Sequence, residues 1–184
     1  MSLVTRIKFF FNKKRFLIQA SPSSGKSYFI SEKSNSYKDF FLYDSDVVKF
    51  KYKLDHADRP KWLDNIDAPV KSILFCGKVN PGKGIITVAV LVPIDKFIKF
   101  AQHREARAKR GEVKCSPERL KFHNKDHFIR KRNKFIRHLK RKRILTFSSF
   151  EVAVDYFDGL LLGKYKNIPV IDSKGELIVY ECLP

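Results

Sequence analysis

The chain has 184 residues and a formal net charge of +19, with 38 lysines and arginines against 19 acids. This length suits one domain, and a hydrophobic content of 43% is enough for a real core. No window of about 18 uncharged apolar residues occurs, which excludes a membrane-spanning helix. Three scattered cysteines, Cys76, Cys115 and Cys182, exclude a disulfide framework and a Cys-x-x-Cys zinc pair. The N-terminus lacks a secretory apolar segment and a cleavage site, so we expect a cytoplasmic protein.

The first predicted strand, which contains Phe16-Leu17-Ile18, leads into the most informative segment of the chain. Ala20-x-x-x-x-Gly25-Lys26-Ser27 follows it, and Lys26 to Glu32 has a helical pattern. Strand, loop and helix in this order are typical of a phosphate-binding loop, in which the lysine contacts the terminal phosphates and the serine hydroxyl contacts magnesium. A glycine before the lysine permits the tight turn that such a loop needs. The pattern therefore predicts a nucleoside triphosphate site.

The second predicted strand, Phe40 to Asp46, ends in two acids. Four apolar residues run without a break into Asp44 and Asp46. Because ligands of open parallel sheets bind at the carboxyl ends of the strands, these carboxylates are candidate site residues. The next helix, residues 59–67, contains Trp62, which we interpret as a core residue or a wall of the substrate pocket. A strand at 72–77 precedes a turn-rich loop with Asn80, a candidate substrate contact.

The second half of the chain continues the alternation. Residues 85–92 form a β-branched run that predicts a strand covered on both faces, and we place it at the centre of the sheet. A helix over 95–110 carries Arg104, Arg107 and Arg110 at intervals of three, along one side. A second helix is predicted over 118–143, after a break at 111–117.

The last predicted elements are a short strand at 144–147, a helix over 148–157 and a hairpin over 168–180 that turns at 172–175. Ser148 and Glu151 match a capping box at the start of that helix. His123 and His127, four residues apart, do not predict a metal site, because basic residues surround them and no glutamate completes the pattern.

Positive charge is concentrated in residues 95–143, which hold nineteen lysines and arginines against five acids, a net charge of +14. A solvated helical surface accounts for many such lysines. So many cations can also hold many phosphates through binding that depends on salt but not on base sequence. One interpretation of this segment is therefore that it binds a polyanionic partner.

The loop, the Asp44 and Asp46 strand end, and the Leu91-Val92-Pro93 strand running into an arginine-rich helix together resemble the nucleoside and nucleotide kinases of the phosphate-loop (P-loop NTPase) superfamily. The small forms encoded by viruses and phages are the most similar, and the resemblance covers roughly residues 15 to 157. It implies an α/β fold with three α/β/α layers and a mainly parallel sheet. A single domain, residues 1–184, would then include a basic helical lid at 95–143 and a C-terminal hairpin at 165–184.

The resemblance also implies ATP and Mg²⁺ as cofactors and assigns roles to individual residues. The triphosphate would be bound by Ala20, Ser21, Ser23, Ser24, Gly25, Lys26 and Ser27. Magnesium would be held by Ser27 and Asp44, while Asp44 or Asp46 would serve the acceptor. Arg104, Arg107 and Arg110 would stabilise the transferring phosphate from the lid, with Arg130 and Arg132 behind them. Contacts to the substrate or to nucleic acid would come from Trp62, Asn80, Arg130 and Arg132.

These observations leave three functions open. The first is a kinase that transfers the γ-phosphate of ATP to a nucleoside or nucleotide, and the second is a kinase that acts on a polynucleotide 5′-hydroxyl. The third is a non-catalytic nucleic-acid-binding or virion protein that retains the fold, in a host cell or a virus particle. An ATP-driven motor is disfavoured, because no late strand ends in paired acids.

Overall fold

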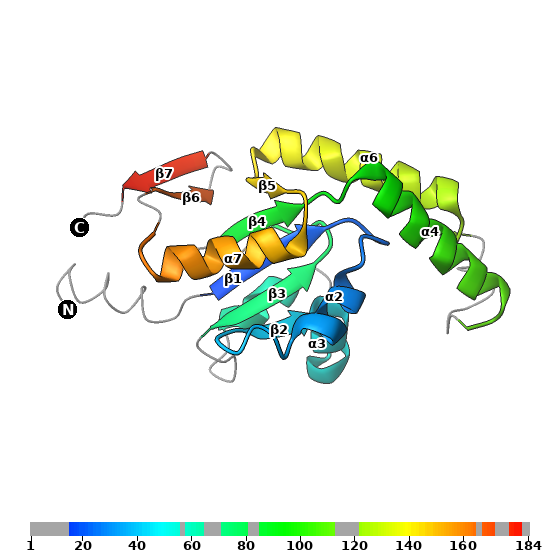
Figure 1. Ribbon diagram of the computed structural model, residues 1–184, viewed down its shortest axis with the longest axis horizontal. Coiled ribbons are helices and arrows are strands. Elements are labelled where there is room, and N and C mark those ends of the chain that lie inside the picture. The colour runs from blue at the N-terminus through cyan, green and yellow to red at the C-terminus, as the bar shows by residue number, and fades with distance from the viewer. Residues whose placement is uncertain are drawn as a thin grey trace.

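The computed structural model describes residues 15–55, 58–64, 71–80, 85–112, 122–164, 167–171 and 177–181. Within this part of the chain, the protein has an α/β fold built on a five-stranded sheet of order β2-β3-β1-β4-β5, in which every pairing is parallel (Figure 1). The carboxyl ends of the strands therefore lie at one edge of the sheet. The strands are β1 (Arg15–Ala20), β2 (Phe41–Asp44), β3 (Ser72–Cys76), β4 (Ile86–Val90) and β5 (Thr146–Phe147).

Among the described residues, helices follow every strand of this sheet except β3, after which β4 comes next. They are α2 (Lys26–Lys33), α3 (Ser45–Tyr52), the 3₁₀ helix η1 (Arg59–Asp64), α4 (Ile94–Lys109), α6 (Lys125–Lys142) and α7 (Phe150–Leu161). A separate antiparallel hairpin consists of β6 (Asn167–Ile171) and β7 (Leu177–Glu181), which confirms the predicted hairpin.

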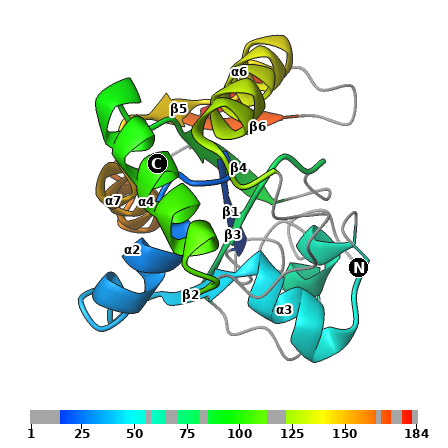
Figure 2. The same cartoon turned by 90° about the vertical axis from the view of Figure 1, so that its right-hand side faces the viewer.

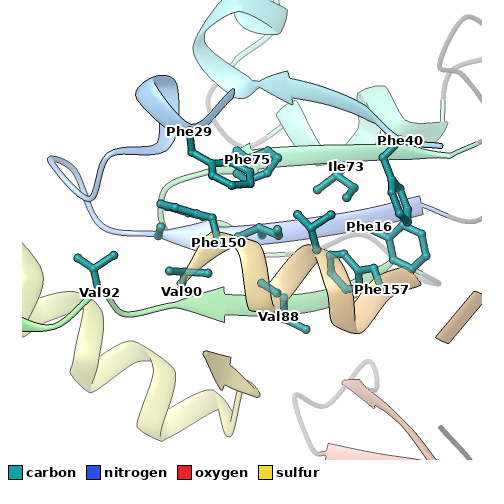
Figure 3. Packing of buried hydrophobic residues seen from close by; sticks show 14 of the residues in the cluster. Phe16, Phe29, Phe40, Ile73, Phe75, Val88, Val90, Val92, Phe150 and Phe157 are labelled. Carbon is teal, nitrogen blue, oxygen red and sulfur yellow. The ribbon is translucent and has the colours of Figure 1, made fainter. Parts of the chain in front are cut away.

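One face of the sheet packs against α2 and α7. Phe16 of β1 stacks on Phe157 of α7 with ring centroids 4.3 Å apart, and Phe75 of β3 contacts Phe29 of α2 (Figure 3). An aromatic pair of this kind contributes about 0.5–1.5 kcal/mol beyond the area that it buries. Phe97 in the first half of α4 belongs to the same core, which fixes that helix to the sheet.

The opposite face packs against α3, η1 and α6. Leu17 and Leu74 contact Trp62 and its neighbours, and Ala89 of β4 packs with Phe135 of α6. Figure 2 looks onto the carboxyl edge and shows α2 and α7 on one side of the sheet and α3 and α6 on the other. This is a three-layer arrangement. Burial on both faces explains why β1 and β3 appear in the sequence as apolar runs without alternation.

Three predictions need correction. The central strand is β1, not the run at 85–92, which becomes β4, because a run buried on both faces does not determine its position in the sheet. The strand predicted to end at Asp46 ends at Asp44, whose side chain caps α3. Ser149 rather than Ser148 caps α7, by accepting a hydrogen bond from Val152 N.

In the described part of the chain, no helix is both long enough and apolar enough to cross a membrane.

The predicted lid divides into two kinds of structure. The second half of α6 lies on the sheet, with Phe135, His138 and Leu139 buried, so it forms part of the core. The second half of α4 and the first half of α6 extend away from the sheet at its carboxyl edge (Figure 1). The helix predicted over 118–143 starts later than expected: α6 begins at Lys125, because the Asn124 side chain accepts a hydrogen bond from His127 N as the N-cap, and residues 122–124 are not helical. Residues 113–121, residues 81–84 and the hairpin turn at 172–175 lie outside the described residues.

Candidate functional site

The loop from Ala20 to Ser27 leaves the central strand at the carboxyl edge of the sheet. Its backbone has positive φ angles at Ser23 (62°) and Gly25 (88°). A Cβ at Gly25 would lie 3.0 Å from the ring of Phe100 in α4. Gly25 is therefore required both by its conformation and by the close packing of α4 against the loop. The loop is held in its shape by a neighbour that sequence analysis did not identify, Phe100.

Lys26 lies over the loop that precedes it. Its Nζ donates hydrogen bonds to the carbonyl oxygens of Ala20 and Ser21, each at 3.1 Å. Burial lowers the pKa of Lys26, the carboxylate of Asp44 opposes this shift, and the positive charge of Arg104 adds to it in a smaller degree. An ammonium group with so few contacts is well placed to accept anionic oxygens as further partners.

Three serines of the loop are buried, or nearly so, close to Lys26. Ser21 and Ser24 are buried and Ser23 is half-buried. The hydroxyls of Ser23 and Ser24 find no hydrogen-bond partner among the described residues. Because buried hydroxyls normally have partners, this loop suits a polar ligand that would satisfy them.

Ser27 and Asp44 bring two oxygen donors together from different elements. The Ser27 hydroxyl, in the first turn of α2, donates to Asp44 Oδ2 at 2.7 Å. Asp44 Oδ1 accepts from the N–H of Asp46 at 2.9 Å, which fixes the carboxylate as the N-cap of α3. Hard oxygen donors of this kind fit Mg²⁺, which is typically held by one or two carboxylates together with substrate phosphates.

Among the described residues no group of three or more His, Cys, Asp or Glu side chains gathers as a protein-only metal cage. The predicted pair, Ser27 and Asp44, is thus the metal-binding candidate that the structure brings into contact, with substrate oxygens as the remaining ligands.

Arg59 completes this edge of the sheet and was not identified from the sequence. It is only 6% exposed, and its Nη1 donates to Ser45 Oγ at 3.1 Å and to Asp46 Oδ1 at 2.7 Å. The Asp46 side chain itself is 71% exposed, so this carboxylate pairs with a buried guanidinium and is still accessible to solvent. One signal was present in the sequence: Arg59 is the only arginine between Arg15 and Arg104, where the other permanently charged basic residues are lysines. Arginine is favoured over lysine in buried ion pairs.

The three predicted lid arginines do not lie together. Arg104 is one helical turn beyond Phe100, and its guanidinium lies 5.3 Å from the ring centroid of Phe128. It is also near enough to Lys26 to affect its pKa, after the larger effect of burial. Arg107 and Arg110, by contrast, both bind Glu112 at the far end of α4. The structure therefore brings Arg104 toward the loop and leaves the other two in ion pairs of their own.

The four residues predicted to contact substrate or nucleic acid are spread over the molecule. Trp62 is a core residue, packed edge-on against Tyr43 at 4.7 Å, and Asn80 is exposed just beyond β3. Arg130 is exposed on α6. Arg132 donates from Nη2 to the carbonyl of Val92 at 3.0 Å, so it fixes α6 to the end of β4.

A buried polar contact joins α6 to the strand that feeds the loop. Gln19, one residue before Ala20, donates to Val79 O at 3.0 Å, and its Oε1 lies 3.2 Å from Nε2 of His138. The imidazole therefore donates from Nε2, since the amide oxygen can only accept. Burial, with Lys78, Arg141 and Lys142 adding to it, lowers the pKa of His138 to about 4. This contact depends on residues 119 positions apart, which no local pattern could predict.

Comparison with known proteins adds no relative. No family model matches the chain, and no curated protein is similar to it in sequence.

Proposed function

We propose that the protein is an ATP-dependent phosphotransferase with a P-loop fold, which moves the γ-phosphate of ATP to the hydroxyl of a nucleoside, nucleotide or polynucleotide. One observation carries the proposal. Lys26 lies over a loop closed by Gly25, and the next residue, Ser27, contacts the carboxylate of Asp44 at 2.7 Å. Phosphoryl transfer needs a lysine, a hydroxyl and a carboxylate around a bound phosphate, and this sheet edge brings these three side chains together.

Binding of ATP is assigned to the loop and to the start of α2. The backbone from Ser21 to Ser27 surrounds the phosphates, and Lys26 exchanges its contacts with Ala20 O and Ser21 O for phosphate oxygens. Ser27 and Asp44 would hold Mg²⁺, which neutralises charge on the phosphates when it is bound. Arg104 is the lid arginine best placed to stabilise the transferring phosphate, because it lies one helical turn beyond Phe100, which packs against the loop.

The acceptor is assigned to the side of the site formed by Asp46 and Arg59. The acceptor oxygen attacks the γ-phosphorus, the bond from that phosphorus to the β–γ bridging oxygen breaks, and ADP leaves with the electron pair. The proton of the acceptor hydroxyl passes to the carboxylate of Asp46, which is exposed and held in place by Arg59. The buried guanidinium thus acts as a positioning residue for the base.

The proposal is tested by transfer of radiolabelled γ-phosphate from Mg-ATP to a panel of nucleosides, nucleotides and 5′-hydroxyl oligonucleotides. We expect labelled product with at least one acceptor class and its loss in Asp44→Asn, with Asp39→Asn as a matched control on an exposed aspartate outside the site. If ATP binds and no acceptor is labelled, the alternative of a non-catalytic nucleic-acid-binding or virion protein replaces the kinase.

A further inference from the structure

Helix α6 presents a face of basic side chains without acidic partners. The helix contains nine lysines and arginines and one acid, Asp126. Among the described residues, no carboxylate forms an ion pair with its exposed cations, in contrast to α4, where Arg107 and Arg110 share Glu112. These exposed cations are Arg130, Lys131, Lys134, Arg137, Lys140 and Arg141.

The exposed cations form a line along the helix. Arg130, Lys134, Arg137 and Arg141 follow the spacing i, i+4, i+7, i+11, which we call the basic stripe, and it extends over about 17 Å at the rise of an α-helix. Such a line suits a partner with regularly repeated negative charges. A nucleic-acid backbone is one such partner, and an anionic membrane surface is another.

The buried side of α6 decides between these partners. A helix that binds a membrane surface inserts its apolar face between lipids. In α6 that face, including Phe128, Phe135 and Leu139, is buried in the protein. The exposed side of the helix is therefore mainly basic, which favours a nucleic-acid backbone.

An aromatic hollow lies at the start of the basic stripe. Its volume is about 430 Å³, and its lining residues are Phe122, His123, His127, Phe128 and Lys131. A second hollow of about 130 Å³ shares His127 and Lys131 with the first and continues to Arg130 and Lys134. The ring of Phe122 is 48% exposed and lies 5.2 Å from that of His127. Exposed aromatic rings beside cations are how proteins bind the bases and phosphates of single strands.

Arg104 connects this hollow to the loop at the carboxyl edge. Its guanidinium lies over Phe128, which lines the hollow. Arg104 stands four residues after Phe100 in α4, and the ring of Phe100 lies against Gly25 of the loop. One helix thus reaches both places, and Figure 2 shows α4 beside α6 at this edge.

We propose that α6 binds a single-stranded nucleic acid, with its phosphates along the basic stripe and one base stacked on Phe122. We further infer that this strand supplies the acceptor hydroxyl, a step that rests on the function proposed above. The strand would approach the loop past Arg104, which lies over Phe128 of the hollow and one helical turn beyond Phe100 at the loop.

The binding part is tested with the full chain and fluorescently labelled 20-nucleotide DNA and RNA strands, by anisotropy between 50 and 300 mM salt. If all six exposed cations contact phosphates, the slope of log K against log salt is about −4. In the triple variant Arg130→Ala, Lys134→Ala, Arg137→Ala we expect binding at least about tenfold weaker and a slope of about −2. All three positions are exposed on a helix, where alanine is well tolerated.

Two controls separate the stripe and the stacking from total charge. Lys33→Ala, Lys38→Ala and Lys164→Ala together remove the same charge from exposed positions away from α6, and should leave affinity and slope close to those of the wild type. Phe122→Ala should weaken binding by about tenfold with the slope unchanged, since stacking does not release counterions.

The proposal is overturned if the α6 variant binds as the wild type does, or if the control triple loses as much affinity. It is also overturned if phosphatidylserine vesicles are bound in preference to either strand. Transfer of phosphate provides the separate readout for the acceptor. Transfer to nucleosides alone would keep the kinase and refute the acceptor assignment, whereas strand binding without any transfer would keep the surface and refute the kinase.

Discussion

Asp46 and Asp44 lie two residues apart and have different surroundings. Asp44 is tied to Ser27 and to the backbone of α3, whereas Asp46 is exposed and paired with the buried guanidinium of Arg59. A carboxylate fixed against a hydroxyl suits a metal, and an exposed carboxylate suits a proton from an incoming hydroxyl. The two acids that the sequence treats as equivalent are therefore assigned different roles.

We expect Asp46→Asn to lower kcat by about 100-fold or more, because an amide cannot accept the acceptor's proton. The affinity for ATP should change by less than about twofold, since Asp46 is not assigned to the triphosphate. Steady-state kinetics with a titration of ATP measures both. Equal and small effects on kcat and ATP affinity would remove Asp46 from the mechanism and leave it as a partner of Arg59.

His138 makes stability depend on pH. Its pKa is about 4 in the folded protein, against 6.5 as the ordinary value. Above pH 6.5 the ring is neutral in both states and contributes its full stability. Between pH 6.5 and 4 the unfolded chain binds a proton that the folded protein does not, so the free energy of unfolding falls, by up to about 3 kcal/mol.

Denaturant unfolding between pH 7 and 4 tests this contribution. The variant His138→Gln keeps an N–H donor for Gln19 and cannot titrate, so its stability should fall less steeply than that of the wild type over this range. Parallel pH curves for the two proteins would show that His138 does not titrate as its burial requires.

At the residue scale, the conformation of the loop was predictable because its residues are adjacent. The tight turn predicted at Gly25 is confirmed by its φ angle of 88°, whereas the roles of Lys26 and Ser27 toward a triphosphate stay predictions. Arg59 and His138 were missed because their partners lie elsewhere in the chain, Asp46 for the first and Gln19 for the second, and an isolated arginine does not by itself show which side chain it binds.

At the scale of elements, α4 is the helix that fixes the loop. Phe97 anchors it in the core, and Phe100, three residues on, lies against Gly25. A helix held at both places can carry Arg104 to the site without a separate domain. Because α4 packs against the loop and also carries Arg104, its position determines both the shape of the loop and the place of Arg104.

Gly25→Ala should destabilise the protein more than Gly111→Ala does. Both glycines have positive φ angles, 88° and 72°, but a Cβ at Gly111 meets nothing within 4 Å, whereas one at Gly25 meets Phe100 at 3.0 Å. We expect losses of about 1 kcal/mol for Gly111→Ala and about 2 kcal/mol or more for Gly25→Ala, by urea unfolding.

A second substitution isolates the contact with Phe100. Phe100→Leu in the Gly25→Ala background should recover part of the additional loss. If Gly25→Ala and Gly111→Ala lower the free energy of unfolding by the same amount, α4 does not pack tightly against the loop. The inference that α4 fixes the loop would then be wrong.

The predicted elements were correct where periodicity was strong and less accurate at their ends. The strand predicted at 85–92 and the helix predicted at 95–110 are present as β4 (Ile86–Val90) and α4 (Ile94–Lys109), because an unbroken β-branched run and a helical spacing of apolar residues are clear patterns. The end of β2 was placed two residues too late, since a short apolar run does not show that Asp44 turns back to cap α3. Strand order depends on pairing between distant segments and was not determined by any single run.

At the scale of the whole molecule, the candidate chemistry lies at the carboxyl edge, whereas most of the positive charge lies on α4 and α6. The edge gathers residues from β1, β2 and α2 around Lys26. The second half of α6 belongs to the core, so a substrate that enters beside it meets a firmly packed surface. The outer half of α4 and the start of α6 extend away from the sheet at the same edge (Figure 1).

The binding of Mg-ATP to the wild type and to Lys26→Ala, measured by calorimetry, tests the central claim most directly. Lys33→Ala is the matched control, because it removes an exposed lysine from the same helix. At 100 times its Kd, Mg-ATP should stabilise the wild type by about 2.7 kcal/mol and raise Tm by about 5–10 °C. We expect Lys33→Ala to behave as the wild type does and Lys26→Ala to lose about 100-fold in affinity, the value of a charge-assisted contact. Equal ATP affinity in Lys26→Ala and the wild type, or no binding by the wild type, would contradict the assignment of the loop as the phosphate site.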